Sequence, residues 1–455
     1  MINVLILAYD FPPYISVGGL RPYSWFKYFK VFDINPIVVT RQWNNKQANG
    51  LDYIAASENT QTIIEKTEYG TIIKSPYFPN LANRILLKYG YNKYKIFRKI
   101  VSGFYELFQW CFFIGPKVQL YFAAREYLKN NNVDAIIVTG EPFILFRYTS
   151  VLSKKNNIPW IADYRDPWTQ NKSRSKNIIL RFWNAYLEKK HLKNVNEIIT
   201  VSQFFKLQIQ KLIKNKSINI IPNGFDNDII NQVSNVEQNR NVFTISFVGT
   251  IYKWHPIESF LKTFNSFICE NSIQNIELKF YGINIEEDLK TIIKDKYKNI
   301  KPFIKIIPKT PNNILVKELA KSNVLLLFNY YSYMGTKIYD YLATNRKILF
   351  CYRNDKEANI LKDKFYNIIE LDSENNHLQE DIINNTNSGI IVEDSEHLLL
   401  VLNNLYEEFT DKGFIENNTT NIDKYSRRRQ AEKLAQIIKE FSLRTGDFHK
   451  KSYFG

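Results

Sequence analysis

The sequence contains few of the residues that build metal centres and disulfide frameworks. Its 455 residues include three cysteines and five histidines. The cysteines, Cys111, Cys269 and Cys351, stand far apart, and no Cys, His or Asp cluster has the spacing of metal ligands. This pattern argues against a disulfide-stapled domain and predicts no metal site. It is typical of a chain kept in a reducing compartment, so we expect the protein to be cytoplasmic.

The sequence also lacks an apolar run long enough to span a bilayer. Its most apolar later stretch, 104–114, is interrupted by Glu106 and Gln109. The first nine residues are apolar but have no basic lead-in, which predicts a β-strand and not a signal peptide. No Walker-type phosphate loop is present. These absences disfavour membrane-spanning proteins and P-loop nucleotide hydrolases.

Acidic residues are scarce in the first half of the chain. Residues 1–230 hold 31 Lys and Arg against 16 Asp and Glu, whereas the remainder holds 30 against 29. Nearly all of the net charge of +16 therefore lies in the first half. A basic half suits an anionic partner, either a membrane surface, a phosphorylated acceptor or nucleic acid. No recognised nucleic-acid motif accompanies the charge, so we expect no nucleic-acid partner.

Strand-like and helix-like segments alternate along the chain. Continuous apolar runs are expected as strands at 3–8, 36–40, 135–139, 160–162, 197–201, 218–221, 243–248, 277–281, 304–307, 324–328 and 347–351. A polar segment interrupts the pattern, so we expect an N-terminal domain at 1–225, a linker at 226–242 and a second domain at 243–424. A terminal helix within 425–455 is expected to pack back on the first domain. The predicted fold class is α/β, with two doubly wound, Rossmann-like domains.

The loop after the first strand carries a pair of glycines, Gly18 and Gly19. In open parallel sheets, ligands bind at the carboxyl ends of the strands. Glycines at such a place let backbone N–H groups approach an anion at the start of a helix. We therefore assign both residues to phosphate binding; the alternative is that they only make a tight turn.

A series of short motifs runs in order from residue 5 to about residue 350. They are Phe11-Pro12-Pro13 with Gly18-Gly19 and Arg21, the sequence IPWIADYRDPW at 158–168, Thr200-Val201-Ser202, IPNGFD at 221–226, FVGTIY at 247–252 and GTKIYDYLA at 335–343. Together they resemble the family 4 retaining glycosyltransferases, in particular a bacterial surface-polysaccharide branch. The resemblance implies the GT-B fold, a cleft between the domains, a nucleotide-sugar donor bound mainly by the second domain and an acceptor bound by the first. It implies front-face displacement without a required metal or cofactor.

The last of these motifs is the main candidate for donor binding. Gly335 and Thr336 stand where a loop opens a helix, which offers N–H groups and a positive dipole end to a diphosphate. Lys337 adds a positive charge. Asp340 lies three residues later on the same helical face and is placed to accept hydrogen bonds from ribose hydroxyls. Taken alone the pattern also fits an exposed Lys–Asp pair; with the resemblance, we assign all four residues to the donor.

Several positions depart from the family pattern. Ser332 stands where many relatives have a Glu that contacts the donor sugar, and Asp340 is shorter than the usual ribose-binding Glu. Thr250 stands where many have a phosphate-binding Arg, and Lys253 or His255 replaces their Lys. We assign Thr250 and Lys253 to the donor. These departures keep open the alternative of an inactive sugar-nucleotide-binding subunit.

Three charged residues, Asp163, Arg165 and Asp166, end a strand of the first half. Arg165 aligns with a donor-contacting His of many relatives, and we assign it to stabilising phosphate charge as the leaving group departs. Asp166 is assigned to orienting the acceptor or taking its proton, so these two residues are the predicted catalytic pair. Arg21, Glu141 and Asp163 are assigned to the acceptor. The alternative is an Arg–Asp ion pair that ties the strand end to a helix.

One segment without acidic residues, 84–99, combines cations with aromatic side chains. Its cations are Arg84, Lys88, Lys93, Lys95, Arg98 and Lys99. Phe97, Val101, Phe104 and Phe108 follow at the spacing of one helical face. Basic amphipathic helices with aromatics are typical of interfacial anchors. We predict that residues 84–113 contact an anionic membrane, at the inner face of the cytoplasmic membrane; the alternative is a core helix with a solvated basic face.

These patterns together predict an enzyme, a retaining glycosyltransferase that resembles hexosyltransferases. It is expected to move a sugar from a nucleotide sugar to a glycan or lipid-linked acceptor, in bacterial surface polysaccharide or lipopolysaccharide synthesis. The alternatives are the inactive subunit and, less favoured, a basic nucleic-acid-binding protein.

Overall fold

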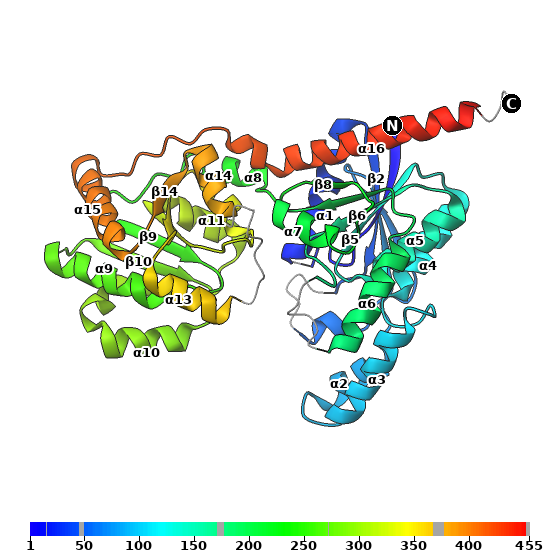
Figure 1. The fold of residues 1–455 in the computed structure, drawn as a ribbon, viewed down its shortest axis with the longest axis horizontal. Helices are drawn as coiled ribbons and strands as arrows, with labels where there is room; N and C mark the ends of the chain where they lie inside the picture. The colour runs from blue at the N-terminus through cyan, green and yellow to red at the C-terminus, as the bar shows by residue number, and fades with distance from the viewer. Residues whose placement is uncertain (15, 45–49, 171–176, 272, 367–376, 452–455) are drawn as a thin grey trace. The chain divides into compact units, whose positions relative to one another are not determined.

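The chain consists of two compact units, each built on one sheet of mainly parallel strands (Figure 1). Unit 1 comprises Met1–Pro222 and Arg427–Gly455, and unit 2 comprises Asn223–Ser426. The computed structural model describes residues 1–14, 16–44, 50–170, 177–271, 273–366 and 377–451, with side chains described up to residue 440. Among the helices so described, none has the length and apolar character needed to cross a membrane.

The sheet of unit 1 has the strand order β3-β4-β2-β1-β5-β6-β7-β8. Its strands are β1 (Ile2–Leu7), β2 (Ile34–Arg41), β3 (Ile63–Lys66), β4 (Thr71–Ser75), β5 (Ala135–Gly140), β6 (Trp160–Tyr164), β7 (Glu197–Thr200) and β8 (Ile218–Ile220). The edge strand β3 is antiparallel to β4, and the other described strand pairs of this sheet are parallel. The strand order reverses between β1 and β5, so the segments that follow these strands diverge at the carboxyl edge of the sheet.

Helices cover both faces of this sheet. They are α1 (Val17–Tyr28), α2 (Leu81–Tyr89), α3 (Lys95–Phe108), α4 (Val118–Asn130), α5 (Ile144–Asn156), α6 (Ile178–His191), α7 (Gln203–Gln210) and α16 (Arg427–Lys451), with short 3-10 turns at Phe29–Phe32 and Asp52–Ile54. α16 lies beside α1 and buries Ala431, Leu434 and Ile438 in the same apolar cluster as β1. The last helix of the chain is therefore part of unit 1.

Unit 2 has a wholly parallel sheet in the order β11-β10-β9-β12-β13-β14. Its strands are β9 (Phe243–Val248), β10 (Ile276–Tyr281), β11 (Ile304–Ile307), β12 (Val324–Phe328), β13 (Lys347–Cys351) and β14 (Gly389–Val392). Its helices are α8 (Asn227–Val233), α9 (Ile257–Asn271), α10 (Glu286–Lys296), α11 (Asn312–Lys321), α12 (Lys337–Thr344), α13 (Lys356–Phe365), α14 (Leu378–Thr386) and α15 (Ser395–Lys412), with 3-10 turns at Lys298–Phe303 and Ile422–Tyr425. The order reverses between β9 and β12. The predicted α/β class with two doubly wound domains is confirmed.

The segment 226–242, expected as a linker, differs from that expectation. It contains α8, which packs on α11 and α12 within unit 2. Two buried residues of α8, Ile229 and Val233, are four positions apart and anchor the helix in an apolar cluster of unit 2. A seven-residue helix surrounded by polar residues shows too little periodicity to be recognised from the sequence.

Candidate active site

Arg165, directly after β6, lies across the start of α1 in unit 1. Its Nε donates to the carbonyl oxygen of Gly140 at 2.7 Å, and its Nη2 donates to that of Glu141 at 3.0 Å. A Cβ atom on Gly18 would lie 1.9 Å from Nη1 of Arg165, so any other residue at this position would displace the guanidinium. The structure thus brings together three residues that the sequence analysis assigns to the site: Gly18, Glu141 and Arg165. The backbone carbonyl of Glu141, and not its carboxylate, holds Arg165.

Gly19 has a different environment from the one expected. Its N–H donates to the Oγ of Ser16 at 2.9 Å, and Ser16 is the N-cap of α1. This N–H therefore satisfies the helix cap. The expectation that it approaches a phosphate is not supported, because the cap already uses the donor.

Asp10, which the sequence analysis does not assign to the site, faces the same place as Arg165. Its Oδ2 accepts a hydrogen bond from Ser16 Oγ at 3.1 Å and lies 3.1 Å from where a Gly18 Cβ would be. Its Oδ1 is buried and accepts no hydrogen bond from the described residues. Burial raises the pKa of Asp10, and the nearby Arg165 opposes that shift. A carboxylate and a guanidinium therefore flank Gly18 at the carboxyl edge of the sheet. Asp10 stands three residues after the end of the buried strand β1, and this position was the available sequence signal.

Arg21 and Asp163, both assigned to the acceptor from the sequence, form a buried ion pair instead. Nη2 of Arg21 lies 2.9 Å from Oδ1 of Asp163, and Nε donates to both carboxylate oxygens. Nη1 of Arg21 donates to the carbonyl oxygens of Ile221 and Pro222. Both side chains are closed to solvent. The pair ties α1 to β6 and to the chain end after β8, which is a structural role; the acceptor assignment of these two residues stays a prediction.

Asp166 lies in the loop that joins β6 to α6. Burial raises the pKa of its carboxyl, and Arg165 opposes the shift. A second carboxylate, Glu188 of α6, holds this loop in place. It accepts hydrogen bonds from the Tyr164 hydroxyl at 2.9 Å and from the N–H and hydroxyl of Thr169. Glu188 is fully buried, and burial raises its pKa. It therefore acts as a positioning residue for the loop that carries Arg165 and Asp166.

In unit 2, the loop after β9 meets the start of α12. Gly249 has a φ of 101°, and a Cβ there would lie 3.4 Å from Cε of Lys337. Nζ of Lys337 lies 3.5 Å from Oδ2 of Asp340, and both side chains are partly exposed. No side chain caps the start of α12 at Thr336. Gly249, Lys337 and Asp340, with the first turn of α12, make what we call the α12 cradle.

The α12 cradle is held in place by a buried tyrosine. The N–H of Val248, the last residue of β9, donates to the hydroxyl of Tyr341 at 3.0 Å. Tyr341 is closed to solvent and belongs to α12. This bond fixes the helix start against the strand end at the point where the strand order reverses. Sequence analysis missed Tyr341, because a Tyr inside an apolar helix face is normally core.

The remaining donor assignments lie on the neighbouring loops. Thr250 and Lys253 are exposed on the segment after Gly249, and Nζ of Lys253 lies 5.9 Å from the ring centroid of Phe365. The ring of Tyr330 approaches Gly335 so closely that a Cβ there would lie 3.2 Å from it. A side chain at Gly335 would therefore require the Tyr330 ring to move by a few tenths of an ångström.

His255, proposed as one possible replacement for a phosphate-neutralising Lys, does not have that role. It is buried, and burial lowers its pKa to about 3. Its Nδ1 accepts a hydrogen bond from the N–H of Tyr252 at 3.3 Å. A neutral, buried ring contributes no positive charge near neutral pH. Lys253 is thus the remaining cation of this segment.

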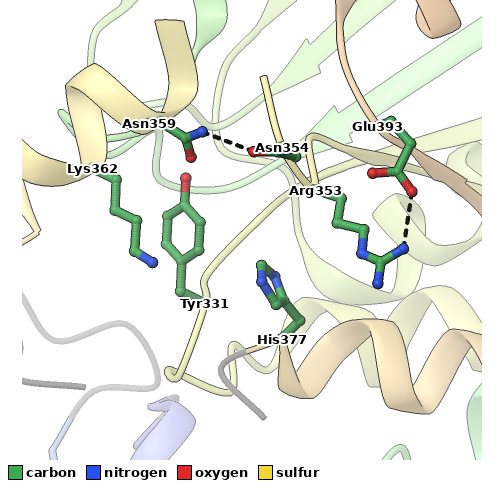
Figure 2. A pocket seen from close by; sticks show the side chains of 7 residues that line it. All are labelled: Tyr331, Arg353, Asn354, Asn359, Lys362, His377 and Glu393. Carbon is green, nitrogen blue, oxygen red and sulfur yellow. Dashed lines mark hydrogen bonds and ion pairs between the residues drawn. The ribbon is translucent and has the colours of Figure 1, made fainter. Parts of the chain in front are cut away.

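A cavity of about 360 Å³ opens at the carboxyl ends of β12, β13 and β14. Its lining residues are Tyr331, Arg353, Asn354, Asn359, Lys362, His377 and Glu393. Figure 2 shows Tyr331 between Lys362 and His377, with Arg353 paired to Glu393. Nζ of Lys362 lies 4.3 Å from the Tyr331 ring centroid. Hydrogen-bonding side chains around one aromatic ring suit a ligand rich in hydroxyl groups.

Comparison with known proteins shows the fold and supports a glycosyltransferase. A family model described as Glycosyltransferase Family 4 matches residues 83–229, a segment that includes Arg165 and Asp166. No curated protein sequence matches the chain. The family match covers less than half of the chain, but it supports a glycosyltransferase.

Solved structures match over nearly the full length. A sucrose-phosphate synthase from Thermosynechococcus elongatus matches with a TM-score of 0.54 and 12% identity, over 100% of this chain and 99% of that chain. A UDP-forming α,α-trehalose-phosphate synthase from Burkholderia xenovorans matches with a TM-score of 0.57 and 9% identity, over 96% and 100%. A glycosyltransferase from Rickettsia africae matches with a TM-score of 0.54 and 14% identity, over 97% and 98%. At these identities the matches show the fold, which is the two-Rossmann GT-B fold.

Proposed function

We propose that this protein is a glycosyltransferase that binds the diphosphate of a nucleotide-sugar donor in the α12 cradle. The placement of the Lys337 side chain next to Gly249, at the uncapped start of α12, carries the proposal. A helix start attracts anions through its N–H groups and dipole, and Lys337 adds a full charge. Asp340, 3.5 Å from Lys337, is the ribose acceptor in this account. The α12 cradle is bordered by the other residues assigned to the donor, which are Thr250, Lys253, Gly335 and Thr336.

The family match to residues 83–229 and the UDP-forming synthase with the same fold support the proposal. We further propose that the cavity around Tyr331 receives the sugar of the donor. Tyr331 lies four residues before Gly335, and the cavity is lined by hydrogen-bonding side chains. Family members often contact this sugar through a Glu, but Ser332 here is buried. A polar cavity beside it offers another set of partners.

On the acceptor side, we propose that Asp10, Arg165 and Asp166 bind the group that receives the sugar. In a retaining front-face displacement, the acceptor oxygen bonds to the anomeric carbon as the bond to the diphosphate breaks. The hydroxyl proton passes to a carboxylate or to a phosphate oxygen. Asp10 suits this task because its Oδ1 accepts no bond from the described residues. Arg165 is assigned to the negative charge that develops on phosphate. This chemistry requires neither a metal nor another cofactor.

The acceptor proposed is a glycan or a lipid-linked intermediate of bacterial surface polysaccharide or lipopolysaccharide synthesis. The excess of 31 Lys and Arg over 16 Asp and Glu in residues 1–230 supports an anionic acceptor or surface. We propose that residues 84–113 contact the inner face of the cytoplasmic membrane. A nucleic-acid partner is not part of this proposal.

The test is release of nucleoside diphosphate from a panel of nucleotide sugars, in the presence of a bacterial lipid extract as acceptor. We expect release from one donor, and Lys337→Ala should reduce the rate by about 100-fold or more, because an interaction with transition-state charge is lost. Lys305→Ala, an exposed Lys of β11, is the matched control and should not change the rate. A rate that Lys337→Ala leaves unchanged would contradict the site. Nucleotide binding without release from any donor would favour the inactive subunit.

A further inference from the structure

Helix α3 has an exposed apolar face. None of its residues is buried, unlike the other long helices of unit 1. Ile96, Ile100 and Phe104 are 76%, 65% and 52% exposed, and their spacing of four residues puts them on one side of the helix. A soluble protein rarely exposes so many large apolar side chains in one place without a partner. The core-helix alternative for this segment is therefore wrong for α3.

The tip of the α2–α3 hairpin contains a cationic hollow beside this face. The hollow has a volume of about 470 Å³, and its lining residues are Tyr91, Asn92, Lys95, Arg98, Lys99 and Ser102. Arg98 is held in position by the carbonyl oxygens of Tyr91 and Lys93. Three cations with no acid among the lining residues favour an anionic group.

Helix α6 exposes a second apolar face. Ile179 and Phe182 are 74% and 72% exposed, and Tyr186 follows four residues later on the same side. α6 follows β6 and the hairpin follows β4, and both strands run parallel to β1. Both segments therefore leave the sheet at the edge that carries Asp10 and Arg165. In Figure 1, α2, α3 and the first turns of α6 extend toward the same end of unit 1.

We propose that the hollow at Lys95, Arg98 and Lys99 binds the phosphate head group of an anionic phospholipid, and that the apolar faces of α3 and α6 rest in the bilayer interface. Cations beside apolar side chains match the chemistry of a lipid, whose phosphate and acyl regions adjoin. A second copy of the chain is less suited to this surface, because two such hollows would bring like charges together. The inference deepens the proposed function and rests on it for one consequence: a lipid-linked acceptor reaches the sheet edge from the membrane. Lipid binding itself is testable without turnover.

The experiment measures partition of the full chain onto vesicles of phosphatidylcholine alone and of phosphatidylcholine mixed with phosphatidylglycerol. We expect strong partition only onto the mixed vesicles. The variant Lys95→Gln/Arg98→Gln/Lys99→Gln should reduce the partition coefficient by about 100-fold, since each cation near the surface contributes about a factor of five. The control Lys298→Gln/Lys301→Gln/Lys309→Gln removes the same charge from exposed positions of unit 2 and should leave partition within a few-fold.

A second variant, Ile179→Ser/Phe182→Ser, tests α6 and should weaken partition onto the same vesicles; Leu400→Ser, an exposed residue of α15, is its control. If the Lys95/Arg98/Lys99 variant and its unit 2 lysine control lose partition onto the mixed vesicles equally, the head-group site is overturned. Unchanged partition of the α6 variant would remove α6 from the surface. A dimer in the absence of vesicles that the α6 variant abolishes would show that a second copy covers this face. Nucleotide binding, measured in parallel, separates failure of this inference from failure of the proposed function.

Discussion

Two arginines of unit 1 show how environment separates a structural residue from a site residue. Arg21 and Arg165 both belong to motifs that resemble the same family. Arg21 directs its guanidinium to Asp163 and two backbone carbonyls and is closed to solvent. Arg165 is partly exposed and lies against Gly18 beside the carboxylate of Asp10. Residue type alone could not tell them apart, because burial depends on which strand ends the fold brings together.

Asp10 carries the clearest residue-level prediction. Asp10→Asn keeps the shape of the side chain but removes its ability to take a proton, so transfer should fall by about 100-fold or more. Nucleotide binding should be unchanged, because the α12 cradle lies in unit 2. Asp33→Asn, at an exposed Asp, is the matched control. Sugar transfer is measured as labelled product. Full activity of Asp10→Asn would remove Asp10 from the acceptor site.

His255 predicts a pH dependence of stability. Its pKa is lowered from 6.5 to about 3 in the folded protein, so between these values the unfolded state binds a proton that the folded state does not. The free energy of unfolding should therefore fall as the pH drops through this window, with His255 contributing about 1.4 kcal/mol per pH unit. Above pH 6.5 this contribution is constant.

The variant His255→Asn retains an oxygen that can accept from the N–H of Tyr252 but does not titrate in this range. Urea unfolding between pH 6.5 and 4 should show a shallower loss of stability for the variant than for the native chain. Parallel curves for the two proteins would contradict a buried, neutral His255.

At the scale of elements, the position of α12 depends on Tyr341. Tyr341→Phe leaves the N–H of Val248 without its acceptor in a buried place, which should cost about 1–3 kcal/mol of stability. Nucleotide affinity should fall as well, since the start of α12 is no longer fixed against β9. Tyr127→Phe, on α4 of unit 1, is the control and should leave nucleotide affinity unchanged. Calorimetric titration and thermal melting measure the two effects. Native affinity in Tyr341→Phe would show that the bond does not position the cradle.

The elements most visible in the sequence were the long buried strands. β1, β5, β9 and β12 are continuous apolar runs, and each was expected within a residue or two of its observed bounds. The short strands β3, β4 and β14 were missed, because four or five residues carry little periodic signal, and β3 and β4 are also of mixed polarity.

Contacts between elements far apart in the chain could not be predicted from the sequence. The pairing of Arg21 with Asp163 joins residues 142 positions apart. Glu188 accepts hydrogen bonds from Tyr164 of β6 and from Thr169 in the loop after it, and Tyr341 accepts one from Val248 of β9. The family-like motifs did lead to Arg165 and Lys337, whereas Asp10 required the fold to show what faces Gly18.

At the scale of the whole molecule, the two units of the fold differ in net charge. Unit 1 holds 39 Lys and Arg against 17 Asp and Glu, together with the cationic hollow of α3. Unit 2 carries the α12 cradle and holds 22 Lys and Arg against 28 Asp and Glu. This division is consistent with one unit that meets an anionic surface or acceptor and another that selects a nucleotide.

The central claim is that this GT-B chain binds a nucleotide-sugar donor. The most direct measurement is thermal melting of the purified protein with UDP, GDP, dTDP, ADP, CMP and their common sugar conjugates. A ligand that binds only the folded state raises its stability by RT ln(1 + [L]/Kd). We predict a shift with one nucleotide and its conjugate, and loss of that shift in Lys337→Ala. No shift with any of them, in a protein that melts cooperatively, would contradict the account.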